Sequence, residues 1–215
     1  NPTGADLTNE QWDSIADLAL ERGFIPFIDT AYQGLGNGLD QDAYGMRMMA
    51  ERLPEVIIAS SCSKNFGLYR ERTGSITFIA ETSEQADIVV SQAMSTARSI
   101  YSMPPAHGAL LVSMVLGDPQ LRSQWEAELE EVRLRIKSMR NLLCDSLENN
   151  AAGMDFSHIK RQNGMFSFLG ITTPQLERLR TEFGIYIVSS TRINLAGVNS
   201  NNIEYLTQSL LTVLE

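Results

Sequence analysis

The chain has 215 residues, of which 43% are hydrophobic, and a formal net charge of -9. This composition is typical of a globular protein with one large domain or two small ones. It argues against nucleic acid as the main partner, because phosphate contacts need clustered basic residues. No apolar run reaches the length of a membrane span, so no membrane partner is expected.

Cysteine and histidine are too few and too scattered for a structural zinc site, and we expect no metal. Cys62 and Cys144 lie far apart without a C-x-x-C spacing, which is typical of reduced thiols in a cytoplasmic protein. The chain starts abruptly at Asn1, without a methionine and without a recognisable signal or transit peptide. We therefore expect it to be a piece of a larger protein.

The first part of the chain alternates helical and strand patterns. A capping box at Thr8 opens an expected helix that runs to residue 22 and stops at Gly23. Ser83 is the expected N-cap of the helix at 83–98. Strands that alternate with helices indicate an α/β fold with a mainly parallel sheet. Apolar runs predict the strands at 24–28, 56–59 and 75–79, and the other two helices are expected at 42–52 and 83–98.

The pattern changes near residue 118. From 119 to 149 apolar residues recur every three or four positions, which predicts one amphipathic helix of about 45 Å at ~1.5 Å per residue. Beyond it the pattern indicates a small α+β domain, with strands at 165–169, 185–188 and 192–195 and helices from 173 and 201. The expected organisation is a large-domain portion at 1–118, a connecting helix at 119–150 and a small domain at 151–215.

The stretch from Ser61 to Arg72 carries the strongest chemical signal. It places Lys64 in a small, polar, glycine-containing setting directly after an apolar run. A lysine amine that has lost its proton can form a Schiff base with a carbonyl compound. A nearby serine and arginine suit the phosphate of an aldehyde cofactor. Asp29 also follows a predicted strand, and ligands bind beyond the carboxyl ends of parallel strands, so both segments can face one crevice.

Five segments resemble, in order and spacing, motifs of the class I (fold type I) pyridoxal-phosphate-dependent aminotransferases, in particular the aspartate and aromatic amino acid enzymes. They are Asn1-Pro2-Thr3-Gly4, Asp29-Thr30-Ala31-Tyr32-Gln33-Gly34, Ser61 to Arg72, Ala97 to Gly108 and Thr191 to Gly197. The resemblance implies the C-terminal half of such an enzyme, with part of the large domain that binds pyridoxal phosphate (PLP), a long helix and the small domain. It also implies a missing N-terminal portion, without which we expect the segment to be inactive or badly folded.

The resemblance implies roles around the cofactor ring. Lys64 is the catalytic lysine, which forms the Schiff base and moves the proton of the substrate. Asp29 is the partner of the pyridinium nitrogen. Tyr32 and Asn1 contact the ring hydroxyl, and Asn1 also faces the substrate.

The remaining roles concern the phosphate and the substrate. By the same resemblance Ser61 and Arg72 bind the cofactor phosphate, and Arg192 binds the α-carboxylate of the substrate. Arg98 matches the arginine that binds a distal side-chain carboxylate. In the family that arginine comes from the partner subunit, which implies a homodimer with Arg98 acting across the interface.

The implied reaction is transamination between an amino acid and a 2-oxo acid. Aspartate or glutamate with 2-oxoglutarate or oxaloacetate is the preferred interpretation, because the segments around Lys64 and His107 look more like those of the aspartate enzymes. The alternative is an aromatic amino acid aminotransferase that uses 2-oxoglutarate, since those enzymes share Arg98. A lyase or decarboxylase is disfavoured by Arg98 together with Arg192. A cofactor-bound regulator or scaffold is an alternative of a different class.

Overall fold

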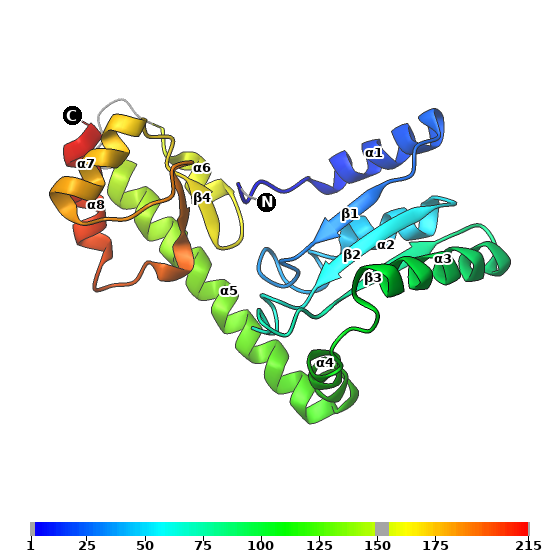
Figure 1. The fold of residues 1–215 in the computed structure, drawn as a ribbon. Coiled ribbons are helices and arrows are strands. Elements are labelled where there is room, and N and C mark those ends of the chain that lie inside the picture. Colours follow the sequence, from blue (N-terminus) through cyan, green and yellow to red (C-terminus); the bar gives the residue numbers. More distant parts are fainter. Residues whose placement is uncertain (1–2, 149–154, 215) are drawn as a thin grey trace. The chain divides into compact units, whose positions relative to one another are not determined.

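The computed structural model describes residues 3–148 and 155–214 (Figure 1). The chain divides into two compact parts, which we call the sheet unit (residues 7–130) and the Arg192 unit (residues 1–6 and 131–215). The division falls inside the long helix, whereas the sequence placed domain bounds at 118 and 150, at the two ends of that helix; those bounds stay a prediction. Among the described residues, the helices lack the combination of length and apolar character that crossing a membrane requires.

A three-stranded sheet forms the centre of the sheet unit (Figure 1). Its order is β1 (Phe27–Thr30), β2 (Val56–Ser61) and β3 (Gly74–Ile79). β1 and β2 are parallel, whereas β2 and β3 are antiparallel. The α/β class is confirmed, and the described sheet is mixed rather than mainly parallel. Residues 62–73 connect β2 to β3 without a helix, the element that usually carries the chain back to form a parallel neighbour.

Two helices, α1 (Asn9–Arg22) and α2 (Tyr44–Arg52), cover one face of this sheet. Their contact is close, since a Cβ at Gly45 would clash with the indole of Trp12. The buried cluster that they form with β2 consists of Ala16, Ala19, Met49, Leu53, Val56 and Ile58. Side chains along a strand alternate between faces, so Asp29 and Ser61 project from the face opposite this cluster.

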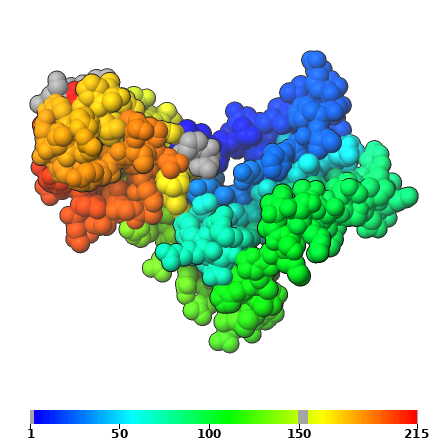
Figure 2. All heavy atoms as spheres, in the orientation of Figure 1, coloured from blue at the N-terminus to red at the C-terminus, as the bar shows by residue number. Residues whose placement is uncertain are grey.

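Helices α3 (Ser83–Tyr101) and α4 (His107–Gly117) carry many exposed apolar side chains. No residue of α3 is buried in the described chain, and Figure 2 shows both helices, in green, on the surface of the sheet unit. The most exposed of these side chains are Ile88, Met94, Ile100, Leu110 and Met114. Exposed apolar side chains that gather in this way are typical of protein–protein, membrane or ligand contact surfaces.

The Arg192 unit is built from short elements around the second part of α5 (Pro119–Glu148). The continuous helix expected from 119 is confirmed. β4 (Phe166–Phe168) and β5 (Arg192–Asn194) form an antiparallel pair in which Phe168 lies opposite Arg192. The remaining elements are α6 (Ser157–Arg161), α7 (Thr173–Phe183), a 3₁₀ turn (Leu195–Gly197) and α8 (Ile203–Leu214).

Two strand predictions were wrong in position or in kind. The first strand lies at 27–30 rather than 24–28, because its extent is set by pairing with β2, and Phe24 and Ile25 are left largely exposed. Residues 185–188 form no strand. There the Ile185 N–H donates to Leu179 O at 3.0 Å, so the segment finishes α7 instead of joining a sheet.

The helix predictions differ at the ends and in number. Thr82, not Ser83, is the N-cap of α3, because its side chain and that of Gln85 form the reciprocal capping box. α2 begins at Tyr44 rather than at Asp42, whose side chain accepts hydrogen bonds from the preceding loop. α4 and α6 were not predicted, since one is apolar on all sides and the other is only 5 residues long.

The cap of α3 can be tested with neighbouring residues. We expect Thr82→Ala to destabilise the first turn of α3 by about 1 kcal/mol, because the Gln85 amide loses its acceptor. Ser83→Ala is the matched control and should change stability by less than about 0.5 kcal/mol. The thermal unfolding midpoint of the full-length protein measures both. An equal effect of the two substitutions would contradict the assignment of the cap.

Candidate active site

The loop between β2 and β3 brings three of the predicted site residues into one closed turn. Its base is fixed where the Cys62 N–H donates to Thr73 O at 3.0 Å, directly beyond the pair of Ser61 and Gly74. Within the loop, Gly67 has φ 67° and donates its N–H to Lys64 O at 3.2 Å. The antiparallel ladder therefore holds Ser61, Lys64 and Arg72 on a single short segment.

The residues after β1 face this loop. Lys64 Nζ lies 4.7 Å from the centroid of the Tyr32 ring, a distance at which the ring face attracts a cation. Asp29 pairs in register with Ala59, two residues before Ser61, so Asp29 and Ser61 project from the same face of neighbouring strands. The structure thus places Lys64 against Tyr32, and Asp29 and Ser61 on the same face of neighbouring strands; that all four form one site stays a prediction.

Asp42 organises the segment that follows Tyr32. Its carboxylate accepts the backbone N–H groups of Gly34, Gly36 and Asn37 at 2.8, 2.9 and 2.7 Å. Hydrogen bonds to a charged acceptor are stronger than neutral ones. Sequence reasoning missed this residue, although a carboxylate shortly after Gly34, Gly36 and Gly38, in a segment that favours turns, was a usable signal.

Trp125 supports the lysine loop from the first part of α5. Its indole Nε1 donates to Asn65 O at 2.8 Å, and its ring stacks on Phe66 with centroids 4.4 Å apart and an interplanar angle of 13°. The two residues that Trp125 contacts directly follow Lys64 in the chain, so these contacts limit the movement of the loop between β2 and β3. Sequence reasoning assigned Trp125 only to the apolar face of the helix, because contacts 60 residues apart leave no local signal.

Positive backbone φ angles occur at one predicted site residue and close to two others. The non-glycine residues with positive φ in the described chain are Arg72 (52°), Ser102 (65°) and Thr191 (63°). Arg72 is itself a predicted phosphate ligand, Thr191 precedes Arg192, and Ser102 N donates to Arg98 O at 3.1 Å. Such conformations cost about 1–3 kcal/mol each and cluster at functional sites. In Arg72 the side chain also donates to Tyr69 O at 2.8 Å.

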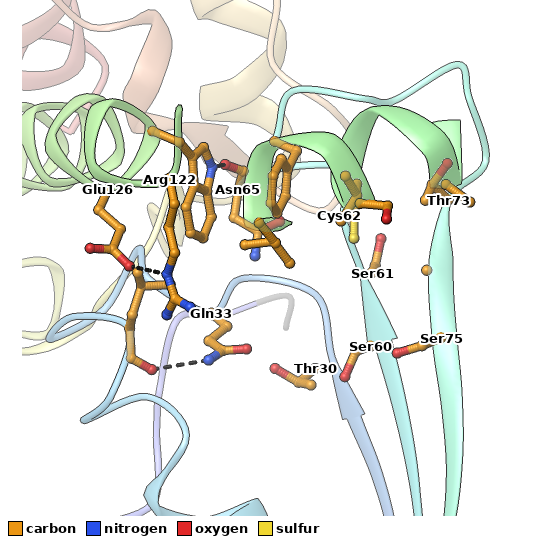
Figure 3. Close-up of a pocket in the computed structure, with 18 of the residues that line it drawn as sticks. Thr30, Gln33, Ser60, Ser61, Cys62, Asn65, Thr73, Ser75, Arg122 and Glu126 are labelled. Carbon is orange, nitrogen blue, oxygen red and sulfur yellow. Dashed lines mark hydrogen bonds and ion pairs between the residues drawn. The ribbon is translucent and has the colours of Figure 1, made fainter. Parts of the chain in front are cut away.

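A cavity of about 580 Å³ lies beside the site rather than at its centre. The side chains of Thr30, Ser60 and Ser75 line it (Figure 3). They lie side by side on the three strands, because Ser60 pairs with Thr30 on β1 and with Ser75 on β3. Ser61 and Cys62 also line it, but Asp29, Tyr32, Lys64 and Arg72 are not among its lining residues. Burial raises the pKa of the Cys62 thiol, which keeps it protonated. Asn65 Oδ1 is buried without a donor among the described residues.

Two further predicted residues, Arg192 and Arg98, belong to other elements, and a third is not described. Arg192 belongs to the Arg192 unit, where its guanidinium carbon lies 4.4 Å from the centroid of the Phe166 ring, and its place relative to Lys64 stays a prediction. Arg98 is exposed in the last turn of α3. Asn1 falls outside the described residues. Within those residues, histidine, cysteine and carboxylate side chains form no group of three or more that could hold a metal ion.

Comparison with known proteins places the chain in a family. Residues 1–210 match the family described as Aminotransferase class I and II. The aspartate aminotransferase of Haemophilus influenzae is 52% identical over 214 residues, which is 100% of this chain and 54% of that protein. The aromatic-amino-acid aminotransferase of Paracoccus denitrificans is 46% identical over 213 residues, covering 99% of this chain and 54% of that enzyme.

Solved structures show the same likeness. An aromatic-amino-acid aminotransferase from Burkholderia pseudomallei, covalently bound to pyridoxal phosphate, superposes with a TM-score of 0.96 at 42% identity; the match covers 100% of this chain and 54% of that one. A psychrophilic aromatic amino acid aminotransferase from Psychrobacter sp. B6, cocrystallised with aspartic acid, has a TM-score of 0.95 at 46% identity. That match covers 100% of this chain and 54% of the Psychrobacter chain. The chain spans about half the length of these relatives.

Asp42 offers a test of the loop that carries Tyr32. We expect Asp42→Asn to weaken the 34–37 turn by roughly 2 kcal/mol, because the turn loses charge-assisted hydrogen bonds. The amides of Gly34, Gly36 and Asn37 should then exchange with solvent about 30-fold faster, measured by hydrogen exchange in the full-length protein. Asp40→Asn is the control, since its exposed carboxylate pairs only with Arg47 among the interactions described here. Unchanged exchange in Asp42→Asn would show that the loop is held by other contacts.

Proposed function

The chain belongs to the class I and II aminotransferases, and from that premise we propose that the whole protein is a transaminase. It exchanges an amino group between an amino acid, with aspartate or glutamate preferred, and a 2-oxo acid such as 2-oxoglutarate or oxaloacetate. The observation that carries the proposal is the position of the Lys64 amine, 4.7 Å from the Tyr32 ring centroid. The same closed loop also holds Ser61 and Arg72.

Pyridoxal phosphate is the cofactor that these side chains fit. The edge of the sheet unit offers a carboxylate at Asp29, a phenol at Tyr32 and an amine at Lys64, and the ends of the loop add the Ser61 hydroxyl and the Arg72 guanidinium. These groups match, in kind, a pyridine nitrogen, a ring hydroxyl, an aldehyde and a phosphate. When bound, the cofactor supplies an electron sink for the bond that breaks at the substrate Cα.

The side chains of the chain itself then have separate tasks. The Asp29 carboxylate keeps a proton on the ring nitrogen by its negative charge. The Lys64 amine would hold the cofactor through its aldehyde carbon before substrate enters, and once freed it would take the proton from the substrate Cα and deliver it to that carbon of the cofactor. Arg192 orients the amino acid through its α-carboxylate, because a planar guanidinium matches a carboxylate bidentately. Asn1 contacts the ring hydroxyl and the substrate from the start of the chain.

Arg98 supports the choice of dicarboxylate substrates. We propose that it binds the distal carboxylate from across a homodimer interface, and the exposed apolar side chains around it on α3 suit contact with a second subunit. The 52% identity to an aspartate aminotransferase favours aspartate. The second candidate is an aromatic amino acid aminotransferase that uses 2-oxoglutarate, which the 46% identical relative favours. Both cysteines are free in the structure, which suits the proposed cytoplasmic location.

The catalytic assignment has a direct test in the full-length protein loaded with pyridoxal phosphate. We expect Lys64→Ala to lose the absorbance band of the lysine-bound cofactor and to reduce turnover by at least about 10³-fold, because the proton carrier is removed. Lys160→Ala is the matched control, since that lysine makes an exposed ion pair with Asp145. Turnover that survives the loss of Lys64 would instead favour a non-catalytic regulator or scaffold.

Substrate choice can be tested through Arg98. In the wild-type protein loaded with pyridoxal phosphate, we expect aspartate to bleach the absorbance band of the lysine-bound cofactor efficiently and phenylalanine to bleach it poorly. Arg98→Leu should lower kcat/KM for aspartate by about 100-fold, because a charged hydrogen-bond partner of the distal carboxylate is lost. Arg22→Leu, in the last turn of α1, is the control. Efficient bleaching by phenylalanine would establish the aromatic alternative.

A further inference from the structure

Arg140 is a buried cation that the proposed chemistry does not use. It lies on the part of α5 within the Arg192 unit, and only 2% of its surface is exposed. Its guanidinium donates to Gly164 O at 2.7 Å, Ile159 O at 2.8 Å and Asn163 O at 2.9 Å, and also to Phe166 O. A buried charge is costly unless hydrogen bonds satisfy it, so these four carbonyls fix the 159–166 segment around one side chain.

The same segment holds the start of the chain. The Asn163 N–H donates to Gly4 O at 2.8 Å, and the Asn163 side chain donates to Asp6 Oδ2 at 3.0 Å. Gly4 has φ 82°, and a Cβ there would lie 2.9 Å from Arg140 Nη2 and closer still to Asn163 O. Gly4 and Asp6 are therefore held against the 159–166 segment that surrounds the Arg140 guanidinium.

The segment also supports Arg192. The Phe166 carbonyl accepts from Arg140, while the Phe166 ring lies under the Arg192 guanidinium with 4.4 Å between the guanidinium carbon and the ring centroid. Phe166 pairs with Asn194 on β5, and Phe168 pairs with Arg192. Thr191, at φ 63°, completes this arrangement by donating its N–H to Val188 O at 2.8 Å. The direction of the Arg192 side chain thus depends on a residue that Arg140 holds.

We propose that Arg140 is a positioning residue, which places Arg192 for substrate binding by holding the backbone of Phe166, the residue whose ring lies under the Arg192 guanidinium. The inference rests on the proposed function, because it takes Arg192 as the group that receives the substrate carboxylate. Burial lowers the pKa of Arg140 to about 10, a value at which the guanidinium stays charged at neutral pH. A charged fork with several donors suits four carbonyls better than a lysine ammonium does.

The test measures binding without turnover. Succinate, a dicarboxylate that carries no amino or oxo group, is titrated by calorimetry into the full-length protein loaded with pyridoxal phosphate. We expect Arg140→Lys to keep its thermal unfolding midpoint within a few degrees and to bind succinate about tenfold more weakly (~1.4 kcal/mol). Arg178→Gln should bind like the wild type, since it removes an arginine of the same unit that donates to Glu182 and to Thr212 O.

Each outcome separates the inference from the proposed function. Wild-type protein that binds no succinate would overturn the carboxylate site itself, and with it the proposed function. Succinate binding that is equal in wild type and in folded Arg140→Lys would overturn only the positioning role. If Arg140→Lys does not fold, Phe166→Leu replaces it, because that change removes the ring under Arg192 and leaves Arg140 in place. It should weaken succinate binding several-fold, and unchanged binding would again contradict the inference.

Discussion

The pairing of β2 with a strand on each side is the constraint on which the proposed site depends. The parallel register places Asp29 beside Ala59, and the antiparallel register places Ser61 beside Gly74 and closes the loop that holds Lys64. A slip of one residue in either register would turn every side chain of a strand to the opposite face. The close approach of Gly74 to Ser60 O, where a Cβ would clash, permits no larger residue in this register.

The groups proposed to touch cofactor and substrate are held by residues that touch neither. Asp42 gathers the amides that follow Tyr32, Trp125 braces the segment after Lys64, and Arg140 gathers the carbonyls beneath Arg192. In each case a charged or aromatic side chain makes hydrogen bonds to the backbone of the segment that it holds. Preorganisation of this kind matters for catalysis, because small displacements of the reacting groups cost much of the rate.

The features that could be predicted from the sequence are those that short segments of the chain determine. The capping box at Thr8 and the long helix from 119 are confirmed, and Lys64 lies against Tyr32, one residue of the motif that follows β1. Asp42 was missed although its contacts are local. The roles of Trp125 and Arg140 could not be predicted, because their contacts are distant in the sequence. The wrong strand at 185–188 has the same origin, since an apolar run becomes a strand only where a partner strand is available.

The most direct test of the account is chemical trapping of the cofactor. The full-length protein, loaded with pyridoxal phosphate, is treated with borohydride, which makes the bond between cofactor and lysine permanent, and the modified peptide is identified by mass spectrometry. The 215 residues contain three lysines, Lys64, Lys137 and Lys160. The account predicts modification of Lys64 alone among them. Modification of Lys137 or Lys160 instead, or of none of the three, would contradict it.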